Sequence, residues 1–221
     1  MVSAVSELEK LAKAANLAAD GTTSGARTAI DALPWLAPAI REDRSVGRFA
    51  AWGRSTVVDE NTGVAVIPRT LFEELHERAG IDADWPLGNA GLLHCYGYLL
   101  SLEPTPYGLK RDRWTEGALA RACHLPPDAF HPWLEGPTLL ARATSAATAL
   151  SIDPTVGARQ GIGGREAHLA LSAACGQAAL TYAVAPAVGT APLLVTMFPV
   201  ADAAAALTEF QTDPRLRWNA V

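Results

Sequence analysis

Residues 91–114 read GLLHCYGYLLSLEPTPYGLKRDRW and bring apolar, aromatic, thiol, imidazole and cationic side chains closest together in the sequence. The first part, from Leu92 to Leu102, is dominated by leucine and tyrosine and leads into Pro104 and Pro106. This pattern predicts a long strand that enters a turn. Because leucine and tyrosine fall on both faces of such a strand, we expect other elements to cover it on both sides.

The same stretch holds chemically useful groups. His94 and Cys95 would point to opposite faces of the strand, which argues against a dyad formed by these two neighbours. Beyond the turn, Lys110, Arg111 and Arg113 follow within four positions, while nearby acidic residues leave the segment with a small net charge. We interpret the three cations as a local cluster of hydrogen-bond donors rather than as part of a basic domain.

The composition limits the class of protein. With 221 residues and 49% hydrophobic content, the chain can bury the core of a single globular unit. We expect residues 1–45 to form a helical segment packed on an α+β domain of residues 46–221. The net charge of −5 argues against nucleic acid or an anionic membrane as the main partner, because those surfaces attract an excess of Lys and Arg.

The sequence also predicts the compartment. No run of about 18 apolar residues is present, and charged residues occupy the N-terminus where a secretory signal needs its apolar core. Cys95, Cys123 and Cys175 are widely spaced and odd in number, which is typical of reduced thiols. We therefore expect a cytoplasmic protein that does not span a membrane, and a homo-oligomer is compatible with the sequence.

The fold class follows from the remaining pattern. We predict one hairpin over residues 46–68, with its turn at Asn61 to Gly63, and a second from residues 178–185 and 192–200. A helix starts at the Thr70–Glu73 capping box and stops at Gly80, with His76 on its solvated side, and another spans residues 201–210. Residues 138–152 fit a strand or a helix. These elements predict a single α+β domain with a mainly antiparallel sheet packed against several helices.

Two further segments resemble binding motifs. Residues 153–164 are rich in breakers, and Arg159 and Arg165 flank their glycines, but the spacing is neither that of a P-loop nor that of a dinucleotide-binding fold. We interpret this segment as a surface loop rather than a phosphate cradle. Residues 119–133 superficially resemble a helix-turn-helix, yet Pro132 breaks the second half and acidic residues replace basic ones. We therefore expect no binding of nucleic acid.

Three kinds of functional site are possible interpretations of residues 91–114. The first is a zinc site, but its candidate ligands occur as adjacent pairs that lack the spacing needed to turn onto one ion; these are His94, Cys95, Cys123, His124 and His131. The second is a cysteine nucleophile, although a thiol in a leucine-rich strand is more often inert packing. The third is a pocket in which arginines grip a carboxylate or phosphate.

The third hypothesis uses the most features of the sequence. It predicts an enzyme of hydrolase or lyase type that acts on a small anionic substrate without a metal or cofactor; the alternative is a non-catalytic domain that binds a ligand or partner. The candidate catalytic residues are His94, Cys95, Tyr96 and Tyr98. The candidate substrate-binding residues are Tyr107, Lys110, Arg111, Arg113, Arg159 and Arg165.

Overall fold

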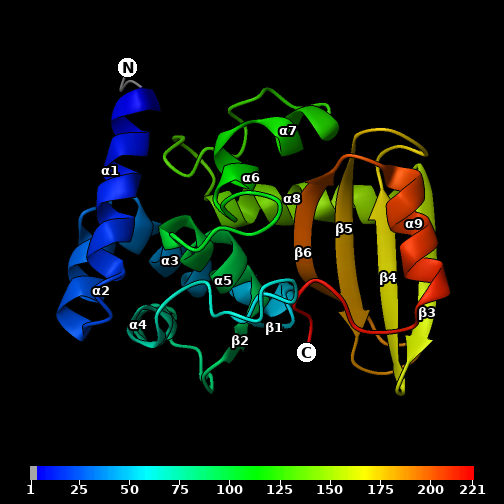
Figure 1. The fold of residues 1–221 in the computed structure, drawn as a ribbon, viewed down its shortest axis with the longest axis horizontal. Helices are drawn as coiled ribbons and strands as arrows, with labels where there is room; N and C mark the ends of the chain where they lie inside the picture. Colours follow the sequence, from blue (N-terminus) through cyan, green and yellow to red (C-terminus); the bar gives the residue numbers. More distant parts are fainter. Residues whose placement is uncertain (1–3) are drawn as a thin grey trace.

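The computed structural model describes residues 4–221, which form an α+β structure (Figure 1). Helices of the N-terminal half gather on one side of the molecule, and a four-stranded sheet stands on the other. Helix α8, Leu139–Ile152, packs against one face of this sheet, and α9, Ala203–Thr212, packs on the opposite face. The antiparallel sheet packed between helices confirms the predicted fold class.

The sheet is an antiparallel meander in which neighbours in sequence are neighbours in space, in the order β3-β4-β5-β6. Its strands are β3 Val156–Ile162, β4 Arg165–Leu171, β5 Ala178–Ala185 and β6 Leu193–Val200. The second predicted hairpin is confirmed as β5 and β6, and the predicted C-terminal helix as α9. Residues 138–152, which the sequence left open, form α8, capped by the Thr138 hydroxyl.

The glycine-rich segment corrects a prediction. Residues 153–164, interpreted as a surface loop, contain β3 and the turn to β4. Gly163 and Gly164 both have positive φ, 56° and 84°, which is the backbone of a tight hairpin turn whose twist matches that of the flanking strands. The two glycines therefore allow the chain to reverse between β3 and β4. The residues of β3 alternate in burial, but many of them are small, so the sequence shows no clear hydrophobic alternation.

The N-terminal half contains helices α1 Ala4–Ala18, α2 Thr23–Asp31, α3 Leu36–Ser45 and α4 Arg69–Ala79. Helix α4 ends where predicted, at Gly80, whose φ of 63° is left-handed. It begins before Thr70, with Pro68 at the N-cap, because Thr70 lies inside the first turn and does not cap it.

His76 on α4 was predicted to be solvated and is buried, with 3% of its surface exposed. Its Nδ1 lies 2.8 Å from the Phe72 carbonyl, to which it must donate, and its Nε2 accepts from the Asn89 amide at 3.2 Å. Glu73 and Glu77 on the same helix are exposed, but the imidazole at position 76 faces β2. His76 is thus a neutral core residue with both ring nitrogens satisfied.

The predicted first hairpin, residues 46–68, is confirmed only next to its turn, where Val58 and Ala65 form an antiparallel bridge, and its arms do not pair as extended strands. The segment contains a 3₁₀ helix, η1 Arg48–Ala51, and a short strand, β1 Arg54–Thr56, that pairs with β2 Leu87–Asn89 instead. The turn itself is present because the Asp59 carboxylate accepts from the amides of Asn61 and Thr62. Local turn chemistry was therefore predictable, whereas the choice of partner strand depended on distant residues.

The predicted strand over residues 92–102 is also wrong. These residues form helix α5, Ala90–Cys95, followed by the 3₁₀ helix η2, Gly97–Leu100. The Asn89 side chain caps α5 by accepting from the Leu92 amide at 3.0 Å. A Cβ on Gly91 would lie 2.7 Å from the Trp52 ring, so the glycine permits close packing of this helix. The segment is covered on all sides, as predicted, but as a buried helix.

The remaining elements connect the two parts of the fold. Two short helices follow the central stretch: α6 Asp112–Thr115 and α7 Ala118–Ala122. After α9, residues 213–221 run back across the sheet and reach β1 (Figure 1). There the Asn219 carbonyl accepts from the Thr56 amide at 2.9 Å. The C-terminal tail thereby joins the sheet to the helical part.

The burial of His76 makes stability depend on pH. Burial lowers the pKa of this imidazole below its usual 6.5, so the unfolded chain gains a proton below about pH 6.5 while the folded chain does not. The free energy of unfolding should therefore fall as pH drops from 7 to 5, by up to about 1.4 kcal/mol per pH unit for this residue. Urea unfolding of His76→Gln should show a correspondingly shallower pH slope.

His124 provides the matched control, since it is exposed and its φ of 59° is one that asparagine tolerates. His124→Asn should keep the slope of the unmodified protein. Equal slopes for all three proteins would contradict the assignment of His76 as a neutral core residue.

Candidate functional site

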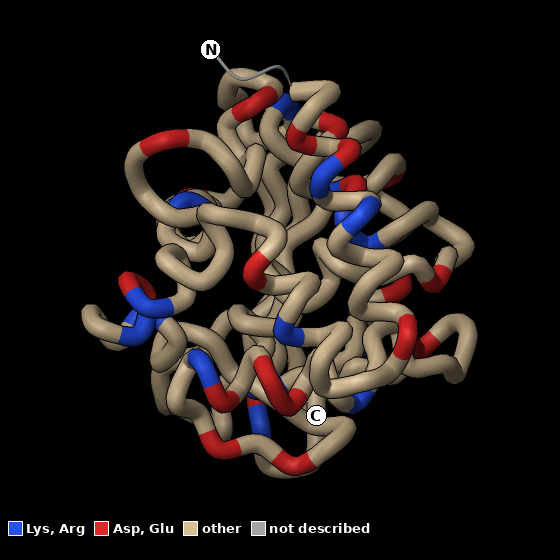
Figure 2. Tube along the Cα trace, turned by 90° about the vertical axis from the view of Figure 1, so that its left-hand side faces the viewer, with Lys and Arg blue, Asp and Glu red and all other residues tan. Residues whose placement is uncertain are grey.

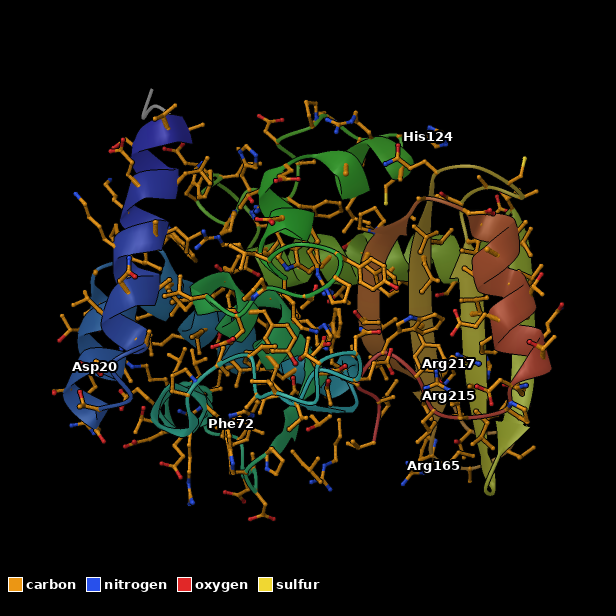
Figure 3. All side chains as sticks on the ribbon, viewed as in Figure 1. Asp20, Phe72, His124, Arg165, Arg215 and Arg217 are labelled. Atoms are coloured by element: carbon orange, nitrogen blue, oxygen red, sulfur yellow. The ribbon has the colours of Figure 1, made fainter. Side chains whose placement is uncertain are left out.

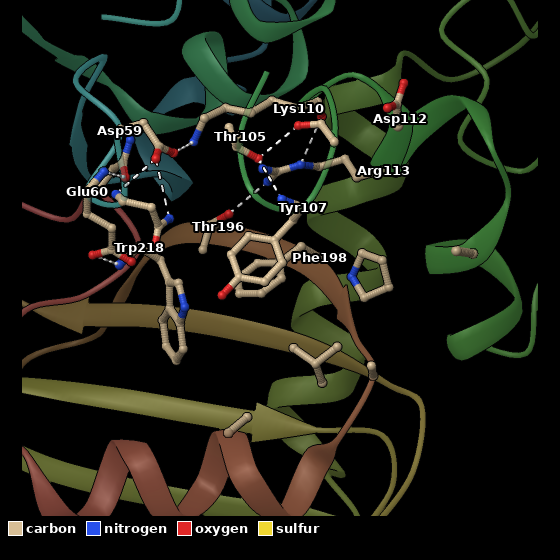
Figure 4. A pocket seen from close by; sticks show the side chains of 18 of the residues that line it. Asp59, Glu60, Thr105, Tyr107, Lys110, Asp112, Arg113, Thr196, Phe198 and Trp218 are labelled. Atoms are coloured by element: carbon tan, nitrogen blue, oxygen red, sulfur yellow. Dashed lines mark hydrogen bonds and ion pairs between the residues drawn. The ribbon is translucent and has the colours of Figure 1, made fainter. Parts of the chain in front are cut away.

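A cavity of about 540 Å³ lies where the helical part meets the edge strand β6 (Figure 4). Its wall is assembled from the turn after β1, His94 of α5, the loop before α6, the C-terminal half of β6, the first turns of α9 and the C-terminal tail. The volume falls in the range of small-molecule sites. Segments far apart in sequence therefore converge on one concave surface.

Arg113 occupies the inner wall of this cavity. Its Nε donates to the Lys110 carbonyl at 3.1 Å, and its Nη1 donates to the Thr196 hydroxyl at 3.0 Å and to His94 Nδ1 at 3.3 Å. The guanidinium carbon lies 5.9 Å from the centre of the Phe198 ring. These contacts hold the guanidinium plane in one orientation.

The charge of Arg113 is not neutralised by the protein. Within residues 4–221, no carboxylate lies within ion-pair distance of its guanidinium, and Nη2 makes no hydrogen bond although it is not shut off from solvent. Burial lowers the pKa of Arg113, yet an arginine keeps its charge in proteins. The inner wall thus presents an unpaired cation whose free N–H groups face the cavity.

Lys110 lies beside Arg113 but is already paired. Its Nζ is 2.7 Å from Asp59 Oδ2, and both side chains are nearly enclosed, at 9% and 3% exposure. The ammonium also lies 5.0 Å from the centre of the Tyr98 ring. Burial and the charge of Arg113 lower the pKa of Lys110, against the opposing effect of Asp59. Asp59 neutralises Lys110, so Arg113 carries the uncompensated charge.

His94 lies behind Arg113, and its protonation can be deduced from its neighbours. Because an arginine can only donate, Nδ1 must accept, and the proton of the neutral ring must sit on Nε2. Nε2 then donates to Ser55 Oγ at 3.1 Å, and Ser55 donates to the Asn219 carbonyl at 3.1 Å. Burial, followed by the charges of Arg113 and Lys110, holds the pKa of His94 well below its usual value.

This arrangement bears on the proposed catalytic role of His94. A histidine that activates a serine must accept the hydroxyl proton, but here His94 donates to Ser55. Ser55 is also completely buried. The direction of this hydrogen bond therefore fits a structural role and not the activation of Ser55.

The other candidate catalytic residues lie outside the cavity wall. Cys95 is fully buried, and burial, with Asp43 nearby, raises the pKa of its thiol. The Tyr96 hydroxyl donates to the buried carboxylate of Asp43, which also accepts from Thr138 and pairs with Arg48. Burial raises the pKa of Tyr98 to about 12, and its hydroxyl donates to the Thr56 carbonyl at 3.0 Å. Cys95, Tyr96 and Tyr98 therefore do not share the cavity wall with His94.

The candidate binding residues separate into two groups. Tyr107, Lys110 and Arg113 line the cavity, with Tyr107 at its mouth and 84% exposed. Arg111 does not line it; its Nη1 is buried without a hydrogen-bond partner among the described residues.

Arg159 and Arg165 lie on the β3–β4 hairpin, where Arg159 is 4.0 Å from Glu166. Figure 3 shows Arg165 at the end of the sheet where β3 turns into β4. Neither arginine lines the cavity.

The candidate zinc ligands are dispersed. His94 and Cys95 are buried in α5, while His124 is exposed at the end of α7, at the other end of the sheet from Arg165 in Figure 3. His131 Nε2 donates to the Thr115 carbonyl at 3.2 Å. Across residues 4–221, no group of three or more His, Cys, Asp or Glu side chains is placed to hold a metal ion.

Several wall residues were missed by the sequence interpretation: Asp59, Thr196, Phe198, Trp218 and Asn219. Asp59 fell within the first predicted hairpin without a role of its own, and β6 was predicted only as half of the second hairpin. Trp218 and Asn219 lie in a C-terminal tail of mixed polar and apolar residues, where the large aromatic side chain was the one local signal. No local pattern connects these positions to residues 110–113, because the cavity forms only when the tail crosses the sheet.

No protein-family model matches the chain, and neither the curated proteins nor the solved structures contain a significant match. Within the described residues, no helix is both long and apolar enough to cross a membrane.

The thiols provide a test of this geometry. Cys175 is exposed, Cys123 is half-buried with a pKa raised by burial to about 11, and Cys95 is enclosed. In the folded protein, a thiol reagent should modify Cys175 quickly, Cys123 slowly and Cys95 only after unfolding, because the thiolate is the reactive form. Reaction kinetics with a chromogenic disulfide would measure this.

In Cys175→Ser the fast phase should disappear while the other phases stay unchanged. A fast phase that persists in this variant would contradict the burial of Cys123 or Cys95, and rapid modification of Cys95 in the folded state would show that the thiol on α5 is accessible.

Proposed function

We propose that the protein binds a small molecule through an anionic group held by Arg113. The observation that carries this proposal is a guanidinium on the inner wall of a cavity with no carboxylate partner among residues 4–221 and with Nη2 free. A charge removed from water without a partner is costly, and a bound anion would provide the missing partner. Arginine is suited to this task because its planar N–H groups match carboxylate and phosphate oxygens.

The contacts around Arg113 orient its guanidinium before a ligand binds. Thr196, His94 and the carbonyls of Lys110 and Met197 occupy Nε and Nη1, which leaves the Nη2 edge to face a ligand. The Asp59–Lys110 pair fixes the neighbouring loop without competing for Arg113. A guanidinium that is already oriented loses little conformational freedom on binding, and this raises affinity.

The same contacts favour binding over catalysis. The four side chains proposed as catalytic are buried, and the pKa of each is moved away from neutrality: His94, Cys95, Tyr96 and Tyr98. General acid–base catalysis works best with a group that titrates near the working pH. The hydrolase or lyase activity predicted from the sequence stays a prediction, and we favour the non-catalytic alternative.

The distribution of charge agrees with a small ligand. Acidic and basic positions mingle along the chain in the view of Figure 2, without a continuous basic stripe. A polyanion such as nucleic acid is bound by clustered Lys and Arg in excess, whereas this chain carries a net charge of −5. The cytoplasmic location predicted from the sequence stays a prediction.

Substitution of Arg113 tests the proposal. Calorimetry with propionate and with inorganic phosphate should detect binding of at least one of these anions to the unmodified protein. Arg113→Lys keeps a positive charge but loses the planar fork and should weaken that binding at least about tenfold, the loss expected for one charged hydrogen bond.

Arg111→Lys is the matched control, since it makes the same chemical change two residues away and outside the cavity. It should bind the anion as the unmodified protein does. Equal affinity in the Arg113 and Arg111 variants, or no binding of either anion to the unmodified protein, would contradict the proposal. Circular dichroism and melting of each variant show whether it is folded.

A further inference from the structure

We infer that the ligand is a monocarboxylate with a flat apolar body, such as an aryl-substituted short acid, and that this body lies along Phe198 and Trp218. The inference rests on the proposed role of Arg113 and names the class of molecule that the rest of the wall accepts. Two features carry it: the aromatic part of the wall, and the excess of carboxylates around the mouth.

The aromatic part of the wall is built by β6 and the C-terminal tail. The rings of Phe198 and Trp218 lie 5.6 Å apart at 64°, and both are half-buried and line the cavity. Because Arg113 is close to the same Phe198 ring, an anionic group at Nη2 would have its attached carbon body directed along this surface. A flat apolar body fits because aromatic faces bind rings by offset or edge contacts.

Trp218 is held in place at the cost of backbone strain. Its φ of 54° is unusual for a bulky side chain, and Asn219 follows with 65°. The strained backbone is fixed by a hydrogen bond from the Trp218 amide to Glu60 Oε2 at 2.9 Å and by the contacts of Asn219 with β1. The indole also packs on the Tyr182 ring at 4.8 Å, so its position in the wall is rigid.

The mouth of the cavity limits the charge of the ligand. Three of the carboxylates that line the cavity make no ion pair within residues 4–221: Asp112, Glu116 and Asp202. Glu60 and Glu209 also line it and are near Arg215, at 3.8 Å each. A second negative charge on the ligand would meet repulsion from these groups, while one charge can be placed at Arg113. Nucleotides and other polyanions are therefore disfavoured.

A set of related acids separates these features. The probes are propionate, 3-phenylpropionate, which adds a ring, and phenylsuccinate, which adds a second carboxylate to 3-phenylpropionate. Calorimetry at pH 7.5 should give a dissociation constant for 3-phenylpropionate at least about tenfold lower than for propionate, since burial of a phenyl ring contributes that much or more. Phenylsuccinate should bind at least about tenfold more weakly than 3-phenylpropionate.

Two variants locate the ring. Phe198→Leu keeps an apolar side chain but removes the flat surface, and it should reduce the preference for 3-phenylpropionate over propionate severalfold. Trp133→Leu makes a comparable change at a half-buried aromatic residue outside the cavity and should keep the full preference. The probe comparison on the unmodified protein stands even if Phe198→Leu fails to fold.

The outcomes distinguish this inference from the proposed function. Equal affinity for propionate and 3-phenylpropionate, or tight binding of phenylsuccinate, would overturn the inference. If the anions that bind are still weakened by Arg113→Lys, the proposed function survives that result. If 3-phenylpropionate binds with the same affinity to the unmodified protein and to Arg113→Lys, both proposals fail.

Discussion

The hydrogen bond from Arg113 to His94 is the contact on which the arrangement of the cavity depends. Arg113 can only donate, so it fixes the tautomer of His94, which then donates to Ser55, and Ser55 donates to the Asn219 carbonyl. This chain connects α6, α5, β1 and the C-terminal tail, and Thr196 adds β6 through bonds to both Arg113 and His94. Removing any one donor would leave a buried acceptor without its partner, which is costlier than never having made the bond. The polar chain therefore specifies how the helical part meets the sheet.

The sequence predicted those parts of the fold that depend on local chemistry. The hairpin of β5 and β6, helix α9, the end of α4 at Gly80 and the turn at Asp59 all follow from short-range patterns. Residues 92–102 were predicted wrongly because a short, uniformly apolar segment has no period that separates a buried strand from a buried helix. The helix is favoured by the cap at Asn89 and by the close contact of Gly91 with Trp52. Both features become informative only once the tertiary neighbours are known.

The sequence predicted only some of the residues that line the cavity. The cluster at residues 110–113 indicated an anion-facing surface, yet Arg111 and Arg113 are two positions apart in backbone that is already helical at residue 111. Successive helical residues are rotated by about 100°, so these two arginines point to opposite sides, whereas Lys110 and Arg113, three apart, share a face. If the start of α6 had been predicted near residue 111, the spacing of three would have grouped Lys110 with Arg113. The contributions of Phe198 and Trp218 could not be predicted, because Phe198 reaches the cavity through the packing of β6 and Trp218 through the path of the tail across the sheet.

The balance of charges explains why only one of the two inner cations is available to a ligand. Lys110 and Arg113 are both removed from bulk water, and burial lowers the pKa of each. Asp59 neutralises Lys110, and the amides of its own turn hold the carboxylate in place, so this pair is complete without a ligand. Arg113 has neutral acceptors on Nε and Nη1, which satisfy its hydrogen bonds on one side but not its charge. A protein optimised only for stability would place a carboxylate or an apolar side chain there, because a partly buried charge without a partner lowers stability. Under the proposed function, the partner that Arg113 lacks is an anion that arrives from solution.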